Sequence, residues 1–328
     1  MVAQLSFDKV YIISIWMESV LYGFLLAITL ASLYVNITLR RHQGLHSRIM
    51  FGVGILMWTI ATIHVGLNCF RLVQGYVIHA GDPGGPAAFF NRLDPWDHVM
   101  KDTLYATQEI LGDAVAIYRT WTLWDQNWKV LAPLAVLFIT SSVFGYAVCD
   151  TFTKIHDSSS IFSHQLSTLI TVFYAMSFVQ SLLTTGLMAY RIWSTDRFST
   201  KYNTSRRWLW PYLRILIESA ALQLVAELIV LALYASQVNA QYIFLESLTP
   251  LVGITFNAIT IRISLRASET FMKKDSERQY VSGYTTRGLA TQTIGGHNIH
   301  PARSIAISIK QDIETDCHSE ADVTYEAK

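Results

Sequence analysis

Residues 101–125, KDTLYATQEILGDAVAIYRTWTLWD, form a mostly apolar run that Glu109, Asp113 and Arg119 interrupt. At about 1.5 Å per residue, a helix of this length crosses a bilayer. Each ionisable side chain would cost roughly 2.5–3.5 kcal/mol in contact with lipid. The run therefore predicts a transmembrane helix that other helices enclose.

Glu109 and Asp113 are four residues apart, so they share one face of this helix. Further residues at helical spacing extend that face as a stripe: Tyr105, Ala116 and Thr120. Arg119 lies off the stripe, near a helix end that Trp121 and Trp124 would place at the membrane interface. The stripe is the first candidate for a functional site.

The composition is that of a membrane protein. The chain has 328 residues, of which 52% are hydrophobic and only 15% are charged, which is too apolar for an ordinary soluble domain. The formal net charge of +1 leaves no basic surplus to bind phosphates, so no nucleic-acid partner is expected.

Seven runs of about 20 mostly apolar residues predict a bundle of seven transmembrane helices. Their approximate ranges are 12–38, 49–73, 100–124, 130–150, 166–192, 210–235 and 242–265. After these runs the composition changes to Ser, Thr, Gly and charged residues, which predicts a disordered tail. The predicted fold is an all-α membrane domain over residues 1–266 with a cytosolic tail over residues 267–328.

Basic residues in the short loops predict the orientation, because such residues stay on the cytosolic side. They gather in the first loop, in the fifth loop and at the end of the seventh span: Arg40, Arg41, Arg48, Arg191, Arg197, Lys201, Arg206, Arg207, Arg262 and Arg266. We therefore expect the N-terminus outside and the C-terminus in the cytosol, with the plasma membrane favoured over internal membranes.

Five polar residues inside the predicted spans form the candidate ligand site: Glu109, Asp113, His64, Asn68 and Glu227. Intramembrane carboxyl groups often mark ligand or ion sites, and these would favour a cationic or hydroxyl-bearing ligand in an outward-opening pocket. The alternative is a hydrogen-bonded structural network with protonated carboxyls and a structural histidine.

Arg119 is a candidate for a cytosolic latch, formed by an ion pair with Glu218 of the sixth span. A local pair between Glu218 and Arg214, four residues earlier, is the alternative. Arg206 and Arg207 belong to the basic fifth loop, which is expected to meet a cytosolic signalling partner or anionic lipid.

Cys69 and Cys149 fall near the predicted outer ends of their spans. A disulfide between the second and fourth spans is one expectation, and two free thiols are the other. With Cys317 the chain has three cysteines and no CxxC pair, too few for a thiolate metal cage. We expect neither a metal nor a cofactor.

Enzyme classes gain no support from the motifs. The chain has no GxSxG nucleophile motif and no phosphate-binding glycine loop, and of its ten histidines only His64 lies well inside a predicted helix. A retinal Schiff base would need a lysine in the last span, and residues 242–264 contain none. We therefore expect no catalytic residues and no opsin chemistry.

Three segments resemble recurring segments of the large group of uncharacterised seven-helix membrane proteins of mushroom-forming (basidiomycete) fungi. They are GDAVAIYRTWTLWD (112–125), RILIESAALQLVAELI (214–229) and PLVGITFNAITIRI (250–263). The topology also resembles that of G-protein-coupled receptors, although AIYRTW stands where an acidic-Arg-Tyr triplet would be expected. The resemblance implies a seven-helix fold and a membrane location, and no ligand or reaction.

The sequence therefore predicts a multi-pass, receptor-like sensor. In such a protein, a small molecule from the outer side biases helix packing and so affects a cytosolic partner at the fifth loop and tail. A transporter or proton-coupled carrier that uses the same carboxylates is one alternative, and a structural or scaffolding membrane protein is another. The lipid bilayer is a partner under every alternative.

Overall fold

The computed structural model describes residues 6–38, 45–92, 95–154, 164–202, 210–262 and 264–265. This part of the chain is all-helical and belongs to one compact unit, Met1–Asp275. The predicted cytosolic tail lies outside the described residues. The helices are α1 (Phe7–Thr38), α2 (Leu45–Val73, continued as a π-helical turn over Gln74–Ile78), the short α3 (Gly85–Phe90), α4 (Trp96–Leu123), α5 (Trp128–Lys154), α6 (His164–Tyr202), α7 (Trp210–Ala235) and a last helix, Gln241–Arg262.

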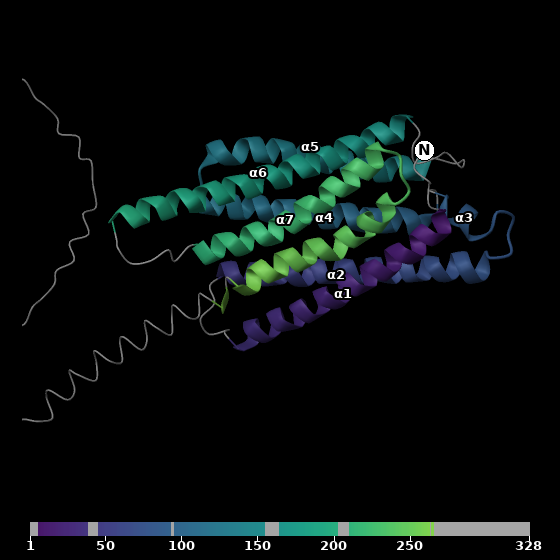
Figure 1. Ribbon diagram of the computed structural model, residues 1–328, viewed down its shortest axis with the longest axis horizontal. Coiled ribbons are helices and arrows are strands. Elements are labelled where there is room, and N and C mark those ends of the chain that lie inside the picture. The colour runs from purple at the N-terminus through teal and green to yellow at the C-terminus, as the bar shows by residue number, and fades with distance from the viewer. Residues whose placement is uncertain are drawn as a thin grey trace, which may run out of the picture. The chain divides into compact units, whose positions relative to one another are not determined.

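The long helices form a seven-helix bundle, and each of the seven predicted ranges overlaps one of them. Figure 1 shows them side by side, with α4 packed against α2, α5 and α6. Short connections join several of them. Asp125 and Gln126 adopt positive φ values of 51° and 61° in the turn between α4 and α5, and Gln237 adopts 54° between α7 and the last helix. These left-handed residues end one helix and reverse the chain.

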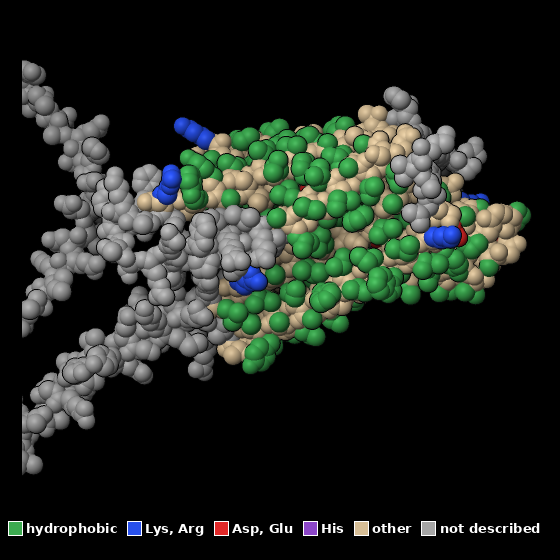
Figure 2. Space-filling view, viewed as in Figure 1, with side chains coloured by type: hydrophobic (Ala, Val, Ile, Leu, Met, Phe, Trp, Pro, Cys, Tyr) green, Lys and Arg blue, Asp and Glu red, His purple; other side chains and the backbone are tan. Residues whose placement is uncertain are grey.

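The outer faces of the bundle are apolar. Large hydrophobic side chains are exposed along them, including Trp16, Phe24, Val136 and Val143. Figure 2 shows hydrophobic side chains spread over the visible face. Five of the described helices are long and apolar enough to cross a membrane: Phe7–Thr38, Arg48–Ile78, Trp128–Lys154, Leu166–Thr195 and Gln241–Arg262. The protein is therefore a multi-pass integral membrane protein, with these faces in contact with lipid.

Helix α4 is enclosed by its neighbours, as its sequence predicted. Eleven of its residues are buried, and four of them come from the predicted stripe, Tyr105, Glu109, Asp113 and Thr120. The prediction that this helix is internal to the bundle is confirmed. Its ionisable groups therefore meet protein instead of acyl chains, which removes the insertion cost they would otherwise carry.

Two apolar clusters separate the polar parts of the interior. The larger one gathers residues of α4, α5, α6, α7 and the last helix, among them Tyr105, Phe152, Phe173, Tyr234 and Leu248. The smaller one joins α2, α4 and the last helix through Met50, Met57, Val115, Val252 and Phe256. Polar side chains are thus confined to defined places between well-packed layers.

Gly112 allows α4 to approach the last helix closely. A Cβ atom at this position would lie 2.8 Å from Val252 Cγ1, closer than real Cβ contacts come. A larger residue would fit there only if the Val252 side chain or one of the helices moved. This contact sets the position of α4 next to the polar groups that follow it.

Candidate functional site

The α4–α7 acid cluster consists of Glu109 and Asp113 of α4, Ser181 of α6, and Gln223 and Glu227 of α7. Its carboxyl groups lie inside the bundle, because Glu109, Asp113 and Glu227 are only 2%, 4% and 6% exposed. Glu227 Oε1 accepts hydrogen bonds from Gln223 Nε2 at 2.8 Å and from Ser181 Oγ at 3.1 Å. Ser181 is also a hydrogen-bond partner of Asp113, so it links the two carboxyls. The predicted stripe of α4 therefore faces α6 and α7.

No cation among the described side chains balances this cluster. Glu109 interacts electrostatically with Glu227 and Asp113, and none of the three pairs with a Lys, Arg or His among the side chains that the structure describes. Both carboxyl oxygens of Glu109 and Oε2 of Glu227 are buried without a hydrogen-bond partner. Three ionised carboxylates in a low-dielectric interior would repel one another and lose most of their hydration. A proton or a bound cation must therefore compensate their charge.

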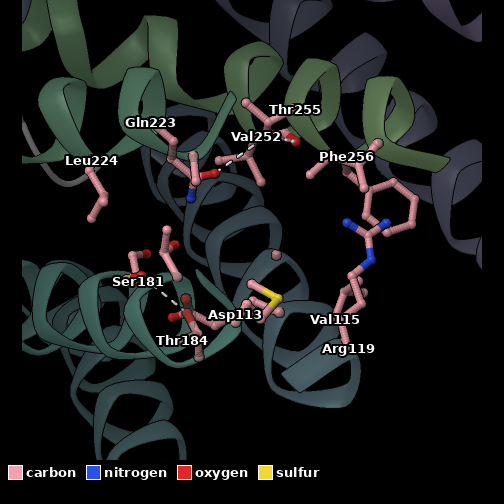
Figure 3. Close-up of a pocket in the computed structure, with 16 residues that line it drawn as sticks. Asp113, Val115, Arg119, Ser181, Thr184, Gln223, Leu224, Val252, Thr255 and Phe256 are labelled. Carbon is pink, nitrogen blue, oxygen red and sulfur yellow. Dashed lines mark hydrogen bonds between the residues drawn. The ribbon is translucent and has the colours of Figure 1, made fainter. Parts of the chain in front are cut away.

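A cavity of about 70 Å³ adjoins the acid cluster between α4, α6, α7 and the last helix. Figure 3 shows Asp113, Ser181 and Gln223 among the side chains around it. Thr255 Oγ1 donates to Gln223 Oε1 at 3.3 Å, so the last helix joins α7 at the cavity wall. The cavity extends from Asp113 toward Arg119, six residues or about 9 Å further along α4.

Arg119 lies at the far side of this cavity and contacts the last helix. Its Nη2 donates to Thr260 Oγ1 at 3.0 Å, and its guanidinium lies over the Phe256 ring, 4.7 Å from the ring centroid (Figure 3). The side chain of Glu218 lies outside the described residues, as do Arg206 and Arg207, so the predicted latch to the sixth span and the predicted coupling loop stay predictions. The contacts that the structure describes join Arg119 to the last helix.

A second polar group, the α1–α2 network, consists of Glu18 of α1, His64 and Asn68 of α2, Lys101 of α4, and Glu246 of the last helix. All five are at most 2% exposed. His64 Nδ1 lies 2.6 Å from Glu18 Oε1, and His64 Nε2 lies 3.5 Å from Glu246 Oε2. Asn68 Nδ2 donates to Glu18 Oε2 at 2.7 Å and to Glu246 Oε2 at 2.8 Å. Lys101 Nζ donates to Glu246 Oε1 at 2.5 Å.

Further charged groups adjoin this network at the start of α4. Arg71 of α2 is fully buried, and its Nη1 donates to Asp97 Oδ2 at 2.8 Å. Asp102 lies 3.4 Å from the Lys101 ammonium and 3.7 Å from His98 Nε2. These pairs fix the N-terminal part of α4 against α2 and the last helix.

The contacts divide the five residues of the predicted ligand site between these two groups. Glu109, Asp113 and Glu227 come together in the acid cluster, whereas His64 and Asn68 belong to the separate network. The two α2 residues share one face, and that face points at Glu18 and Glu246.

The cavity beside the acid cluster lies on the Arg119 side of Asp113, in the half of the bundle that the loop charges assign to the cytosol. The predicted outward-opening pocket stays a prediction.

Glu18, Lys101 and Glu246 are the residues of this network that the site predicted from the sequence did not include. Lys101 is the first residue of the run 101–125, and Glu246 lies in the run QYIFLESLTPLV, where a lone charge inside an apolar segment is a signal of an intramembrane partner. The pairing itself spans 145 positions of sequence, and no local pattern predicts it.

Of the two alternatives for the cysteines, the structure has the one without a disulfide. Cys69 and Cys149 are both free thiols. Cys69 is exposed on α2, whereas Cys149 is buried in the larger apolar cluster among residues of α5 and α6, so the two side chains face different surroundings.

No family model and no curated protein matches the chain. Among solved structures, a crystal structure of thermophilic rhodopsin aligns with 18% identity and a TM-score of 0.35, over 81% of this chain and 99% of that chain. At this distance the likeness carries no argument about function. The functional proposal depends on the geometry of the polar clusters.

Proposed function

We propose that this protein is a receptor-like membrane sensor whose stimulus is a proton or small cation that binds at the α4–α7 acid cluster. The observation that supports the proposal is a set of three buried carboxyls, Glu109, Asp113 and Glu227, with no cationic partner among the described side chains. Adding or removing one positive charge there changes the repulsion between α4 and α7. That change alters the relative stability of alternative helix packings.

The volume of the cavity favours a small stimulus. Drug-sized ligands occupy pockets of about 300–1,000 Å³. The cavity beside Asp113 measures about 70 Å³, which is room for a few water molecules or a hydrated small cation. Its polar lining includes Ser181, Gln223 and Thr255. Their oxygen atoms can coordinate an alkali cation or accept a hydrogen bond from water.

The end of α4 offers a route from the acid cluster to the surface. Trp124 Nε1 donates to the Leu187 carbonyl oxygen of α6 at 3.3 Å. Arg191 of α6 lies over the Trp124 ring and pairs with Asp125 Oδ2 at 2.5 Å. A shift of α4 relative to α6 would change these contacts. They lie toward the end of α6 that leads into the basic fifth loop. A cytosolic partner at that loop and the tail, and a location in the plasma membrane, are parts of this proposal.

Trp124 serves as the probe in a direct test. Full-length protein in lipid nanodiscs is titrated with acid and, separately, with Na⁺ and K⁺, while tryptophan emission is recorded for wild type and for Trp124→Phe. The difference in emission between these two proteins reports on Trp124. We expect this difference to change with one of the cations. In the background of the Glu109→Gln/Glu227→Gln double variant, the same difference should stay constant.

Asp150→Asn is the matched control, because Asp150 is an exposed carboxylate that pairs with Lys154 at the end of α5. This variant should respond as wild type does. A Trp124 signal that no cation changes, or that responds equally in the double variant and in wild type, would refute the proposal.

A proton-coupled carrier is the second candidate, because the same uncompensated carboxyls would serve a coupling ion. Vesicles loaded with a pH-sensitive dye distinguish the two. A carrier moves protons across the membrane at a rate that falls in the Glu109→Gln/Glu227→Gln variant, whereas a sensor shows the Trp124 response without flux. A scaffold shows neither, and neutralising the carboxyls then changes only its stability.

A further inference from the structure

The α1–α2 network has the residue types and the spacing of a transition-metal site. One ligand atom each of Glu18, His64 and Glu246 lies within 4.8 Å of the other two, and all three residues are buried. They come from α1, α2 and the last helix, so three separate helices converge on one point. A histidine nitrogen with carboxylate oxygens is a common ligand set for Zn²⁺ and related divalent metals.

The separation between His64 and Glu246 fits metal ligands better than a hydrogen bond. His64 Nε2 and Glu246 Oε2 are 3.5 Å apart, beyond the usual N–H···O distance of about 2.7–3.2 Å. Two ligands of a tetrahedral Zn²⁺ at about 2.05 Å from the metal are about 3.3 Å apart. The observed gap is within about 0.2 Å of that value.

The other contacts of these residues are those that orient metal ligands. His64 Nδ1 lies 2.6 Å from Glu18 Oε1, and a carboxylate on one ring nitrogen commonly directs the other nitrogen to a metal. Lys101 holds Glu246 through Oε1, which leaves Oε2 facing His64 and Asn68. His64 and Glu246 are therefore each held in orientation by a contact at the atom that does not face the metal position.

Asn68 supplies a further ligand atom. Its Nδ2 lies between the two carboxylates, while its Oδ1 is buried without a hydrogen-bond partner. A rotation of the Asn68 amide by about 180° exchanges the two atoms and places Oδ1 between the two carboxylates. That arrangement is favourable only when a cation stands between the carboxylates, because three oxygens would otherwise face one another.

The charged groups in and beside the α1–α2 network are two positive charges short of neutrality. Four carboxylates, Glu18, Asp97, Asp102 and Glu246, face two permanent cations, Arg71 and Lys101. With neutral histidines, the network and the groups that adjoin it therefore have two uncompensated negative charges; three of the four carboxylates are buried, and Asp102 is 16% exposed. One divalent metal ion balances them.

We propose that Glu18, His64 and Glu246 bind one Zn²⁺-class divalent transition-metal ion, with Asn68 as the fourth ligand. The ion joins α1, α2 and the last helix. This site is separate from the α4–α7 acid cluster, and the inference does not depend on the sensor function.

Cobalt is a suitable probe because a four-coordinate Co²⁺ site absorbs visible light. The full-length chain also carries His297, His300, Cys317 and His318, which lie outside the described residues and are themselves metal-binding side chains. The test therefore uses a full-length background with His→Gln and Cys→Ser at these four positions. Metal is removed with a chelator, and Co²⁺ is titrated into the protein in nanodiscs.

We expect one Co²⁺ per chain, with the absorption of a four-coordinate site that Zn²⁺ removes and Mg²⁺ does not. His64→Gln should abolish this absorption. His79→Gln is the matched control, because His79 lies outside the network at the end of the π-helical turn and bonds the Gln74 carbonyl oxygen. This control should bind Co²⁺ as the background protein does.

Two results would overturn the proposal: the folded background protein shows no such absorption, or His64→Gln retains it. If His64→Gln does not fold, X-ray absorption of the Zn²⁺-loaded background protein decides. One imidazole with oxygen ligands supports the site, and a sulfur ligand or the absence of imidazole contradicts it.

Discussion

Replacing Lys101 by methionine removes the cation that holds Glu246 and keeps an unbranched side chain of similar length. The Lys101 ammonium is 1% exposed, lies 2.5 Å from Glu246 Oε1 and 3.4 Å from Asp102 Oδ1. Removing one partner of a buried pair costs about 3–5 kcal/mol, because a charge stays buried without compensation. We expect Lys101→Met to lower the free energy of unfolding by that amount.

Lys154→Met is the matched control on the same protein. Lys154 pairs with Asp150 four residues earlier on α5, and the two side chains are 70% and 59% exposed. Exposed pairs contribute about 0–1 kcal/mol. The two lysine variants should therefore differ by at least about 2 kcal/mol, although each replaces one lysine by methionine.

Equilibrium unfolding of the full-length protein in mixed micelles, followed by near-UV circular dichroism, measures both variants. The Lys101→Met/Glu246→Gln double variant should recover much of the loss, because it removes the buried carboxylate that Lys101→Met leaves unpaired, and glutamine can still accept from Asn68. If Lys101→Met is no more destabilising than Lys154→Met, the inference that the α1–α2 network stabilises the bundle is refuted.

Two further predictions concern packing and the acid cluster. Gly112→Ala places a Cβ 2.8 Å from Val252 Cγ1 and should destabilise by about 1–3 kcal/mol in the same unfolding assay. Gly66→Ala, where nothing lies within 4 Å, should instead stabilise by up to about 1 kcal/mol through helix propensity, and equal effects at the two sites would contradict the packing of α4. Glu227→Gln should unfold no more easily than wild type, because it removes a like charge and keeps the carbonyl that accepts from Ser181; a clear loss of stability would show that the carboxylate has an unrecognised cationic partner.

The sequence was informative wherever a local pattern carries the structure. Apolar runs of membrane-spanning length predicted the long helices, and the polar content of residues 101–125 predicted that this helix is enclosed. Helical spacing placed Glu109 and Asp113 on one buried face. These features depend on residues within one helix, so periodicity can report them.

Contacts between helices could not be predicted in the same way. Glu18, His64 and Glu246 meet only because α1, α2 and the last helix pack together, and their positions in the chain are up to 228 residues apart. The rotation of α2 about its axis decides that His64 joins this group instead of the acid cluster. Likewise, the depth of Cys69 and Cys149 left both a disulfide and two free thiols open, and only the structure shows that both are free. Depth follows from sequence position, but direction follows from packing.

Infrared spectroscopy of the acid cluster tests the central claim most directly. Protonated and ionised carboxyl groups absorb at different frequencies, so difference spectra of the nanodisc-embedded protein, taken as acid or a small cation is added, follow their charge. The account predicts at least one carboxyl band that changes with the added cation in wild type and is absent from the difference spectrum of Glu109→Gln/Glu227→Gln, whereas the bands of Asp113 and of exposed carboxyls remain in both. Identical difference spectra of wild type and of this double variant would contradict it.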